Sequence, residues 1–319
     1  MGMRVPEAYQ VQIPASSGTD SGFGRYRFRL YRYRFRPIST DQQVQVLPLL
    51  SRTYMVNQVQ IPGELVGDLS TLDGDMVVSQ ANDLVEATQS FTLNEKRLLI
   101  AMAAKIKPHV PAPKNGLYTL HADDFADVFG METRHVYEIL ADAAGRLFNR
   151  RIRKIRDHAT RKGKRIIEDI RVVWKAVYNE GEGTVTLGPS PDLVPYLSLI
   201  HRDFTRYKLR QIGQLGSFYA VRFYELMAQY RNAGDRTISL ERLREMLDLG
   251  EKYKDVKNLR VRVIDPAIAE INKHTDLRVV VTPQRKGRKV VGFHFDITQD
   301  DQIPLDLPEP AHDSQNEPV

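Results

Sequence analysis

Apolar residues recur at helical or strand spacing from Val77 to Ile297, whereas the first seventy residues show no sustained period apart from alternating arginine and aromatic residues between Arg25 and Arg36. Apolar positions three and four apart indicate amphipathic helices, and strict alternation indicates strands. Thr92 followed by Glu95 is the pattern of a capping box at a helix start. In chain order, the first half predicts helices over 77–87, 91–107, 121–131 and 132–150, a strand over 117–120, a hairpin over 151–179 and a strand over 184–188.

The second half repeats this order of elements with little sequence identity. It predicts a helix over 217–231 of amphipathic character, a strand over 235–239, helices over 240–250 and 252–271, and a hairpin over 276–297. Gly130 and Gly250 end equivalent helices. Helix, strand, helix, longer helix and hairpin is the order of a winged-helix domain, a helix-turn-helix followed by a β-wing. We therefore predict an α+β fold with two tandem winged-helix domains with short β-wings, residues 71–200 and 201–298.

The predicted helix over 252–271 has two contrasting sides. On a helical wheel one side is apolar, formed by Val256, Leu259, Val263, Ala267 and Ile271, with Ile264 and Ile268 beside them. The opposite side carries Lys254, Asn258, Arg262 and Asp265, with Lys257 at its border. Arginine suits guanine and asparagine suits adenine in a major groove. We predict base contacts from Lys254, Asn258 and Arg262, with Lys257 and Arg260 as alternatives. Arg260 falls inside the apolar arc, from which it could instead reach a phosphate, and Asp265-Pro266 permits either a kink or a new helix start.

Two basic hairpins accompany these helices. The second-half hairpin has Arg285, Lys286, Arg288 and Lys289 at its tip, where a wing contacts phosphates. The first-half hairpin, interpreted as the first wing with its tip near Lys162–Lys164, holds the densest basic patch, from which we predict phosphate contacts by Arg153, Lys154, Arg161, Lys162, Lys164 and Arg165. A solvated or dimer-forming hairpin is the alternative. The helix before it has a mixed face, and Trp174, the only tryptophan, is predicted to lie in the core.

Charge and composition narrow the function. The net charge is +6, but residues 71–298 hold 38 Lys and Arg against 29 Asp and Glu, which favours a polyanionic partner. The chain has no cysteine, no phosphate-binding G-x-x-x-x-G-K-[ST] loop and no His-x-His pair, so we predict no catalytic residue, no metal site and no cofactor. No stretch is apolar enough to span a membrane, and we expect a cytoplasmic protein. The leader, residues 1–70, is predicted to be flexible, and residues 299–319 form an acidic tail without Lys or Arg.

Three segments carry a resemblance to a known family. SQANDLVEATQSFTLNEKRLLIAMAAKI, FTRYKLRQIGQLGSFYAVRFYELMAQY and VKNLRVRVIDPAIAEINKHTDLRVVVTPQRKGRKVVGFHFDI follow one another in the chain. Together they resemble the initiator proteins of iteron-bearing bacterial plasmids, the RepA/RepE/RepB type, over about Val77 to Ile297. The leader and the tail depart from that family's compact core, so the resemblance implies nothing about them.

The resemblance implies a DNA-binding function without catalysis. Such proteins bind repeated sites, called iterons, in double-stranded DNA at a plasmid origin, chiefly through the third helix of the second domain. The resemblance also implies recruitment of host DnaA and the DnaB helicase by monomers, and homodimers that repress their own promoter at an operator. A transcriptional repressor without a replication role is the alternative, and tandem direct repeats beside the gene would favour the initiator.

Overall fold

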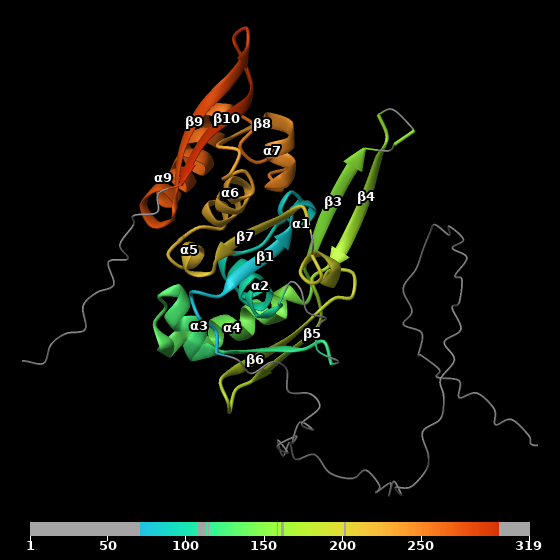
Figure 1. Cartoon of the computed structure of the whole chain (residues 1–319), viewed down its shortest axis with the longest axis vertical. Helices are drawn as coiled ribbons and strands as arrows, with labels where there is room; N and C mark the ends of the chain where they lie inside the picture. The colour runs from blue at the N-terminus through green and yellow to red at the C-terminus, as the bar shows by residue number, and fades with distance from the viewer. Residues whose placement is uncertain are drawn as a thin grey trace, which may run out of the picture. The chain divides into compact units, whose positions relative to one another are not determined.

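The computed structural model describes residues 71–107, 113, 115–157, 159–160, 163–200 and 202–299, all within one compact unit, Gln58–Val319 (Figure 1). The predicted leader and residues 300–319 of the predicted tail lie outside these residues. Among the residues described, no helix combines the length and the apolar character that crossing a bilayer requires.

The first domain has the predicted winged-helix order. Its elements are α2 (Leu93–Lys105), β2 (Tyr118–His121), α3 (Ala122–Phe129), α4 (Thr133–Leu147), β5 (Val173–Asn179) and β6 (Thr184–Pro189). The three strands form an antiparallel sheet in the order β2-β6-β5. The predicted capping box is confirmed, because the Thr92 hydroxyl accepts from the Glu95 amide and the Glu95 carboxylate accepts from the Thr92 amide.

The second domain repeats this architecture. Its elements are α6 (Phe218–Ala228), β8 (Asp235–Ser239), α7 (Leu240–Met246), α8 (Val256–Leu259), the π-helix η3 (Arg260–Ile264), α9 (Asp265–His274), β9 (Leu277–Lys286) and β10 (Lys289–Gln299). Its sheet has the equivalent order, β8-β10-β9. Gly130 and Gly250 occupy equivalent places with φ of 60° and 47°, a left-handed conformation that glycine adopts without strain. The prediction of two winged-helix domains is confirmed.

The remaining elements lie outside these two patterns. They are β1 (Val77–Ala81), α1 (Asn82–Val85), β3 (Arg151–Asp157), β4 (Arg165–Arg171), the short 3-10 helix η2 (Val194–Tyr196), β7 (Phe204–Lys208) and α5 (Arg210–Gly213). β1 pairs with β7 in an antiparallel two-stranded sheet. The helix predicted over 77–87 is therefore wrong in its first half, which is a strand. The boundary predicted between residues 200 and 201 stays a prediction.

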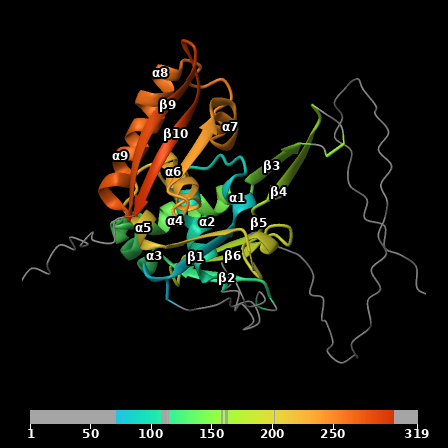
Figure 2. The same cartoon turned by 45° about the horizontal axis from the view of Figure 1, so that its top comes forward.

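The basic hairpin of the first half is not the wing of its domain. β3 and β4 pair only with each other as a sheet, in full register from Arg151–Arg171 to Asp157–Arg165, and they stand apart from the β2-β6-β5 sheet in Figures 1 and 2. The strands equivalent to the second domain's wing are β5 and β6. We call β3–β4 the inserted hairpin, because it is added between α4 and the true wing.

Helix α6 is confirmed as a helix but not as an amphipathic one. Every residue from Ala220 to Ala228 is buried, including Arg222 and Glu225. One side of the helix meets the first domain, where Arg222 donates to the carbonyl oxygens of Val85 and Ala87. On the second domain's side, the Tyr224 hydroxyl donates to Asp276 at 3.0 Å. A helix buried on both sides needs apolar or paired residues all round.

Trp174 does not lie in the core as predicted. Its side chain lies at the surface of edge strand β5 and is 48% exposed. The indole packs over Gly188 of the neighbouring strand β6, where a Cβ atom would lie 2.6 Å from the indole nitrogen. Alternation along β5 correctly predicted a strand, but it did not show which face of the strand packs on the core.

Candidate nucleic-acid interface

The helix predicted to contact bases is one continuous helical run, residues 256–274, which we call the third helix. Asp255 caps its start by accepting from the Lys257 amide. Backbone angles stay right-handed helical through Leu259, Arg260, Ile264 and Asp265. The alternative of a new start at Asp265-Pro266 is therefore not adopted.

A π-helical turn, Arg260–Ile264, precedes Pro266 in the third helix. Pro266 has no N–H to donate to the preceding turn, and the Asp265 amide donates instead to the Arg260 carbonyl, five residues back. The wider turn lets Arg260 leave the apolar arc where the wheel placed it. Its guanidinium pairs with the Asp265 carboxylate at 3.1 Å, and both side chains are 42% exposed. Arg260 is thus held at the surface by a partner of its own helix.

The two sides of the third helix are divided as predicted. The apolar side is buried against its own domain at Leu259, Val263, Ile264, Ala267, Ile268 and Ile271, and Val256 is half-buried. Lys257, Asn258 and Arg262 are exposed on the opposite side. Lys254, predicted to lie in this helix, is exposed but precedes its cap Asp255, so the predicted start at residue 252 is wrong. Within the described part of the chain, only Lys254 among these four has a side-chain partner, the exposed Glu251 at 2.5 Å. Three polar side chains are therefore free for a ligand.

The tip of the β9–β10 wing lies near the same end of the domain as α8 (Figure 2). Lys286 pairs with Lys289 across a two-residue turn at Gly287 and Arg288, where Gly287 has φ of 62°. The four basic side chains predicted here, Arg285, Lys286, Arg288 and Lys289, are all exposed. Among the described residues none of the four forms an ion pair, so the tip concentrates uncompensated positive charge.

Three basic residues of the inserted hairpin are paired with carboxylates instead. Arg153 binds Asp169 through two hydrogen bonds of 2.7 and 2.9 Å, and Arg165 pairs with Glu245 at 2.9 Å. The Lys154 side chain, only 14% exposed, donates to Asp83 and to the Tyr196 hydroxyl. These partners give the three side chains a structural role, and their predicted phosphate contacts stay predictions.

Two predicted hairpin residues, Arg161 and Lys162, lie outside the described residues. Lys164 is described and exposed, and its contact with phosphate likewise stays a prediction. On α4, which takes the equivalent place to the third helix in the first domain, His135, Glu138 and Asp142 are exposed. Two of these three side chains are acidic, so this face is less suited to a phosphate backbone than the third helix is.

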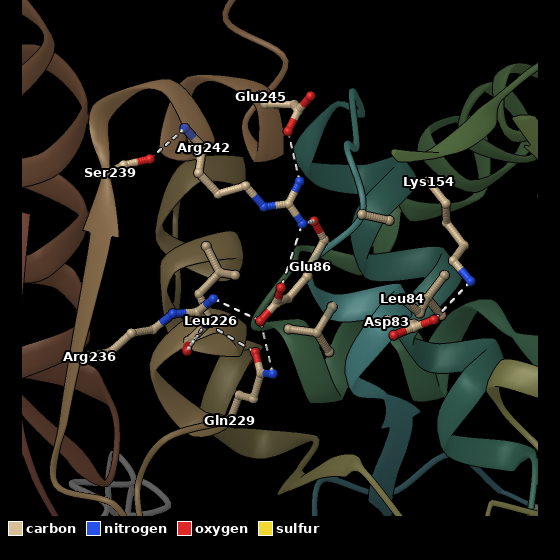
Figure 3. A network of polar contacts seen from close by, with 12 residues as sticks. Asp83, Leu84, Glu86, Lys154, Leu226, Gln229, Arg236, Ser239, Arg242 and Glu245 are labelled. Atoms are coloured by element: carbon tan, nitrogen blue, oxygen red, sulfur yellow. Dashed lines mark hydrogen bonds and ion pairs between the residues drawn. The ribbon is translucent and has the colours of Figure 1, made fainter. Parts of the chain in front are cut away.

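A polar network that the sequence did not predict joins the two domains (Figure 3). Its centre is Glu86, just after α1. The Glu86 carboxylate accepts from Arg236 of β8 at 2.9 Å and from Gln229 at 3.1 Å, and it pairs with Arg242 of α7 at 3.5 Å. Arg242 also pairs with Glu245 at 2.7 Å. No local pattern signals contacts between residues about 150 positions apart.

Comparison with known proteins agrees with this architecture. Residues 77–228 match the family model of the first winged-helix domain of initiator replication proteins, described as "Initiator Replication protein, WH1". Residues 239–297 match the model of the second domain, "Initiator Rep protein, WH2". The chain belongs to the initiator replication protein family.

Related initiators and a solved structure share most of the chain. A "Replication initiation protein" of Escherichia coli is 24% identical over 238 residues, covering 72% of this chain and 72% of that protein. The "PI protein" of Escherichia coli is 22% identical, covering 70% and 83%. The crystal structure of the Pi initiator protein in complex with iteron DNA is 25% identical, with a TM-score of 0.62, and covers 72% of this chain and all of that chain.

Within this initiator, α6 falls at the end of the first-domain match and carries a fully buried ionic cluster. Glu225 pairs with Lys96 of α2 and with Arg222, both at 2.8 Å, and all three side chains are inaccessible to solvent. Burial lowers the pKa of Lys96 to about 8, although the charge of Glu225 opposes this. Burial alone would raise the pKa of Glu225, but the charges of Lys96 and Arg222 lower it to about 2. The cluster fixes α6 on the first domain.

Proposed function

We propose that this initiator starts plasmid replication by binding tandem repeated sites in double-stranded origin DNA. The third helix enters the major groove, with Asn258 and Arg262 on base edges and Lys254, Lys257 and Arg260 near them. The basic tip of the β9–β10 wing contacts the phosphate backbone beside the groove. The protein serves as a binding and assembly platform and catalyses no reaction itself.

One observation carries this proposal: the third helix buries its apolar side and leaves Lys257, Asn258 and Arg262 exposed and without a partner in the described part of the chain. On the inserted hairpin, by contrast, Arg153, Lys154 and Arg165 each pair with a carboxylate. The tip of the β9–β10 wing, at the same end of the domain as α8 in Figure 2, has four basic residues that also lack ion pairs among the described residues. The iteron DNA seen with the Pi initiator, whose fold this chain shares, supports duplex DNA as the ligand.

Further partners follow from the same proposal. We propose that monomers at the origin recruit host DnaA and the DnaB helicase, and that homodimers bind an operator and repress the initiator's own promoter. The place of action is the cytoplasm, where plasmid DNA lies. The family resemblance supports these roles, and the mixed face of α4 offers a surface for a protein contact.

The test has a binding arm and a replication arm. In the first, the full-length chain selects duplexes from a random-sequence library, and affinity for the selected duplex is compared with that for a scrambled one. We expect at least about a thousandfold preference, typical of specific DNA-binding proteins. Selection of no sequence, or equal affinity for both duplexes, would refute the proposal.

In the replication arm, a plasmid whose only origin is the DNA beside this gene is introduced into a host with and without the protein. Transformants that depend on the protein are expected. A protein that binds its selected site and silences its promoter, but supports no transformants, is a repressor without a replication role. Arg262→Ala, which removes a proposed base contact, should lower plasmid establishment, and Arg202→Ala, which removes a 92% exposed cation outside the third helix and both hairpins, is the control.

A further inference from the structure

An apolar side chain lies among the polar ones on the exposed side of the third helix. Val261 is 58% exposed, in the second residue of the π-helical turn. Its neighbours along the helix surface, three and four residues away, are Lys257, Asn258, Ile264 and Asp265, and of these Ile264 is buried. Val261 therefore lies beside the polar residues of the surface proposed to enter the groove.

Val261 cannot serve the helix in either of the ordinary ways. It is not part of the buried side, whose members Leu259, Val263 and Ile264 are at most 1% exposed. It also adds little to helix formation, because β-branched residues lose side-chain freedom in a helix. Single exposed apolar residues are common on protein surfaces, but this one stands beside Lys257, Asn258 and Asp265, on the surface proposed to contact bases.

The major groove offers one apolar group to such a side chain. Thymine presents its C5 methyl group there, whereas the other base edges present hydrogen-bond donors and acceptors. A valine has no donor or acceptor in its side chain, and an exposed one gains free energy only when it meets an apolar surface. The ligand chemistry that fits Val261 is therefore a methyl group on a pyrimidine.

We propose that Val261 is a specificity-determining residue that contacts the C5 methyl group of a thymine in the bound site. This inference rests on the proposed function, since it requires the third helix to lie in the groove. Asn258, one turn before, and Arg262, next along the chain, contact the adjacent bases through hydrogen bonds. Val261 thereby distinguishes thymine from cytosine at a position where the hydrogen-bonding residues do not.

The test removes the methyl group alone. The duplex selected by the full-length chain is resynthesised with each thymine replaced, one at a time, by deoxyuridine, which keeps every hydrogen-bonding group. We expect one replacement to weaken binding by the wild-type protein about fourfold, which corresponds to about 0.8 kcal/mol for one buried carbon group. Val261→Ala should bind the thymine and uracil forms of that position alike.

The matched control is Val280→Ala on β9. Val280 is 63% exposed but lies outside the third helix, so its variant should keep the full fourfold difference. The inference would be overturned if, at every thymine of the selected duplex, replacement by deoxyuridine changed binding equally in the wild type and in Val261→Ala. The proposed function would remain intact in that case. Failure to select any duplex would overturn the proposed function, and the inference with it.

Discussion

Replacing Glu225 by glutamine tests whether the buried cluster holds α6 in place. The Glu225 carboxylate accepts from Lys96 and Arg222 at one oxygen and from Gln80 and the Tyr207 hydroxyl at the other. Glutamine keeps the size of the side chain but removes the charge and turns one acceptor into a donor. Two buried cations then lack their counter-charge, and an NH₂ group faces other donors.

Two routes give the size of this effect. Removing one partner of a buried ion pair costs about 3–5 kcal/mol. Independently, the pKa of Glu225 falls from 4.5 to about 2, and a shift of that size corresponds to about 3 kcal/mol of stabilisation of the ionised form. We therefore expect Glu225→Gln to lower the free energy of unfolding by about 3–5 kcal/mol.

Urea unfolding followed by Trp174 fluorescence measures this, because the chain has a single tryptophan and it lies in the first domain. Asp169→Asn is the matched control. It breaks the ion pair between Asp169, whose side chain is 30% exposed, and Arg153, which is 53% exposed. The free energy of unfolding should fall by about 0–1 kcal/mol. A Glu225→Gln cost no larger than that of the control would refute the reasoning.

Three further predictions concern pH, DNA and the contact between the domains. Because the folded-state pKa of Glu225 is lowered, its stabilisation is complete above pH 4.5 and is lost as the pH falls toward about 2, so acid should shift the urea midpoint more in the wild type than in Glu225→Gln. In binding titrations, Arg262→Ala should weaken the selected site by about 1–3 kcal/mol with little change on scrambled DNA, whereas Lys286→Ala should weaken both alike and reduce the salt slope by about 1. Glu86→Gln should speed hydrogen exchange in α7, because it loosens the contact of this helix with the first domain. Glu251→Gln, whose exposed ion pair lies within one domain, should not. Equal exchange in the two variants would show that Glu86 does not hold the domains together.

Periodicity predicted the repeated winged-helix order because that information is local. The division of the third helix into a buried and an exposed side follows from residue spacing, and the structure agrees from Leu259 to Ile271. The place of Arg260 did not follow from the wheel, because an ideal α-helix has no π-helical turn. Only Pro266, which removes an N–H donor, signalled a departure from it.

What failed depends on partners distant in the sequence. Val77–Ala81 is a strand because it pairs with Phe204–Lys208, and five residues with mixed polarity do not specify that partner. The alternating residues of β3 and β4 predict strands, but alternation cannot tell a wing from an inserted hairpin. Likewise, the charges of Arg153 and Lys154 are visible in the sequence, while the carboxylates that neutralise them are not.

The burial of α6 on both sides determines which spacing of contacted DNA segments the protein can bind. If both winged-helix domains bind one duplex, the packed contact at α6, rather than a flexible linker, fixes the distance between the domains and their rotation about the DNA axis. Adding one base pair between the two contacted segments turns one segment by about 34° relative to the other, given roughly 10.5 base pairs per helical turn. Sites with altered internal spacing should then lose affinity even when every contacted base is kept.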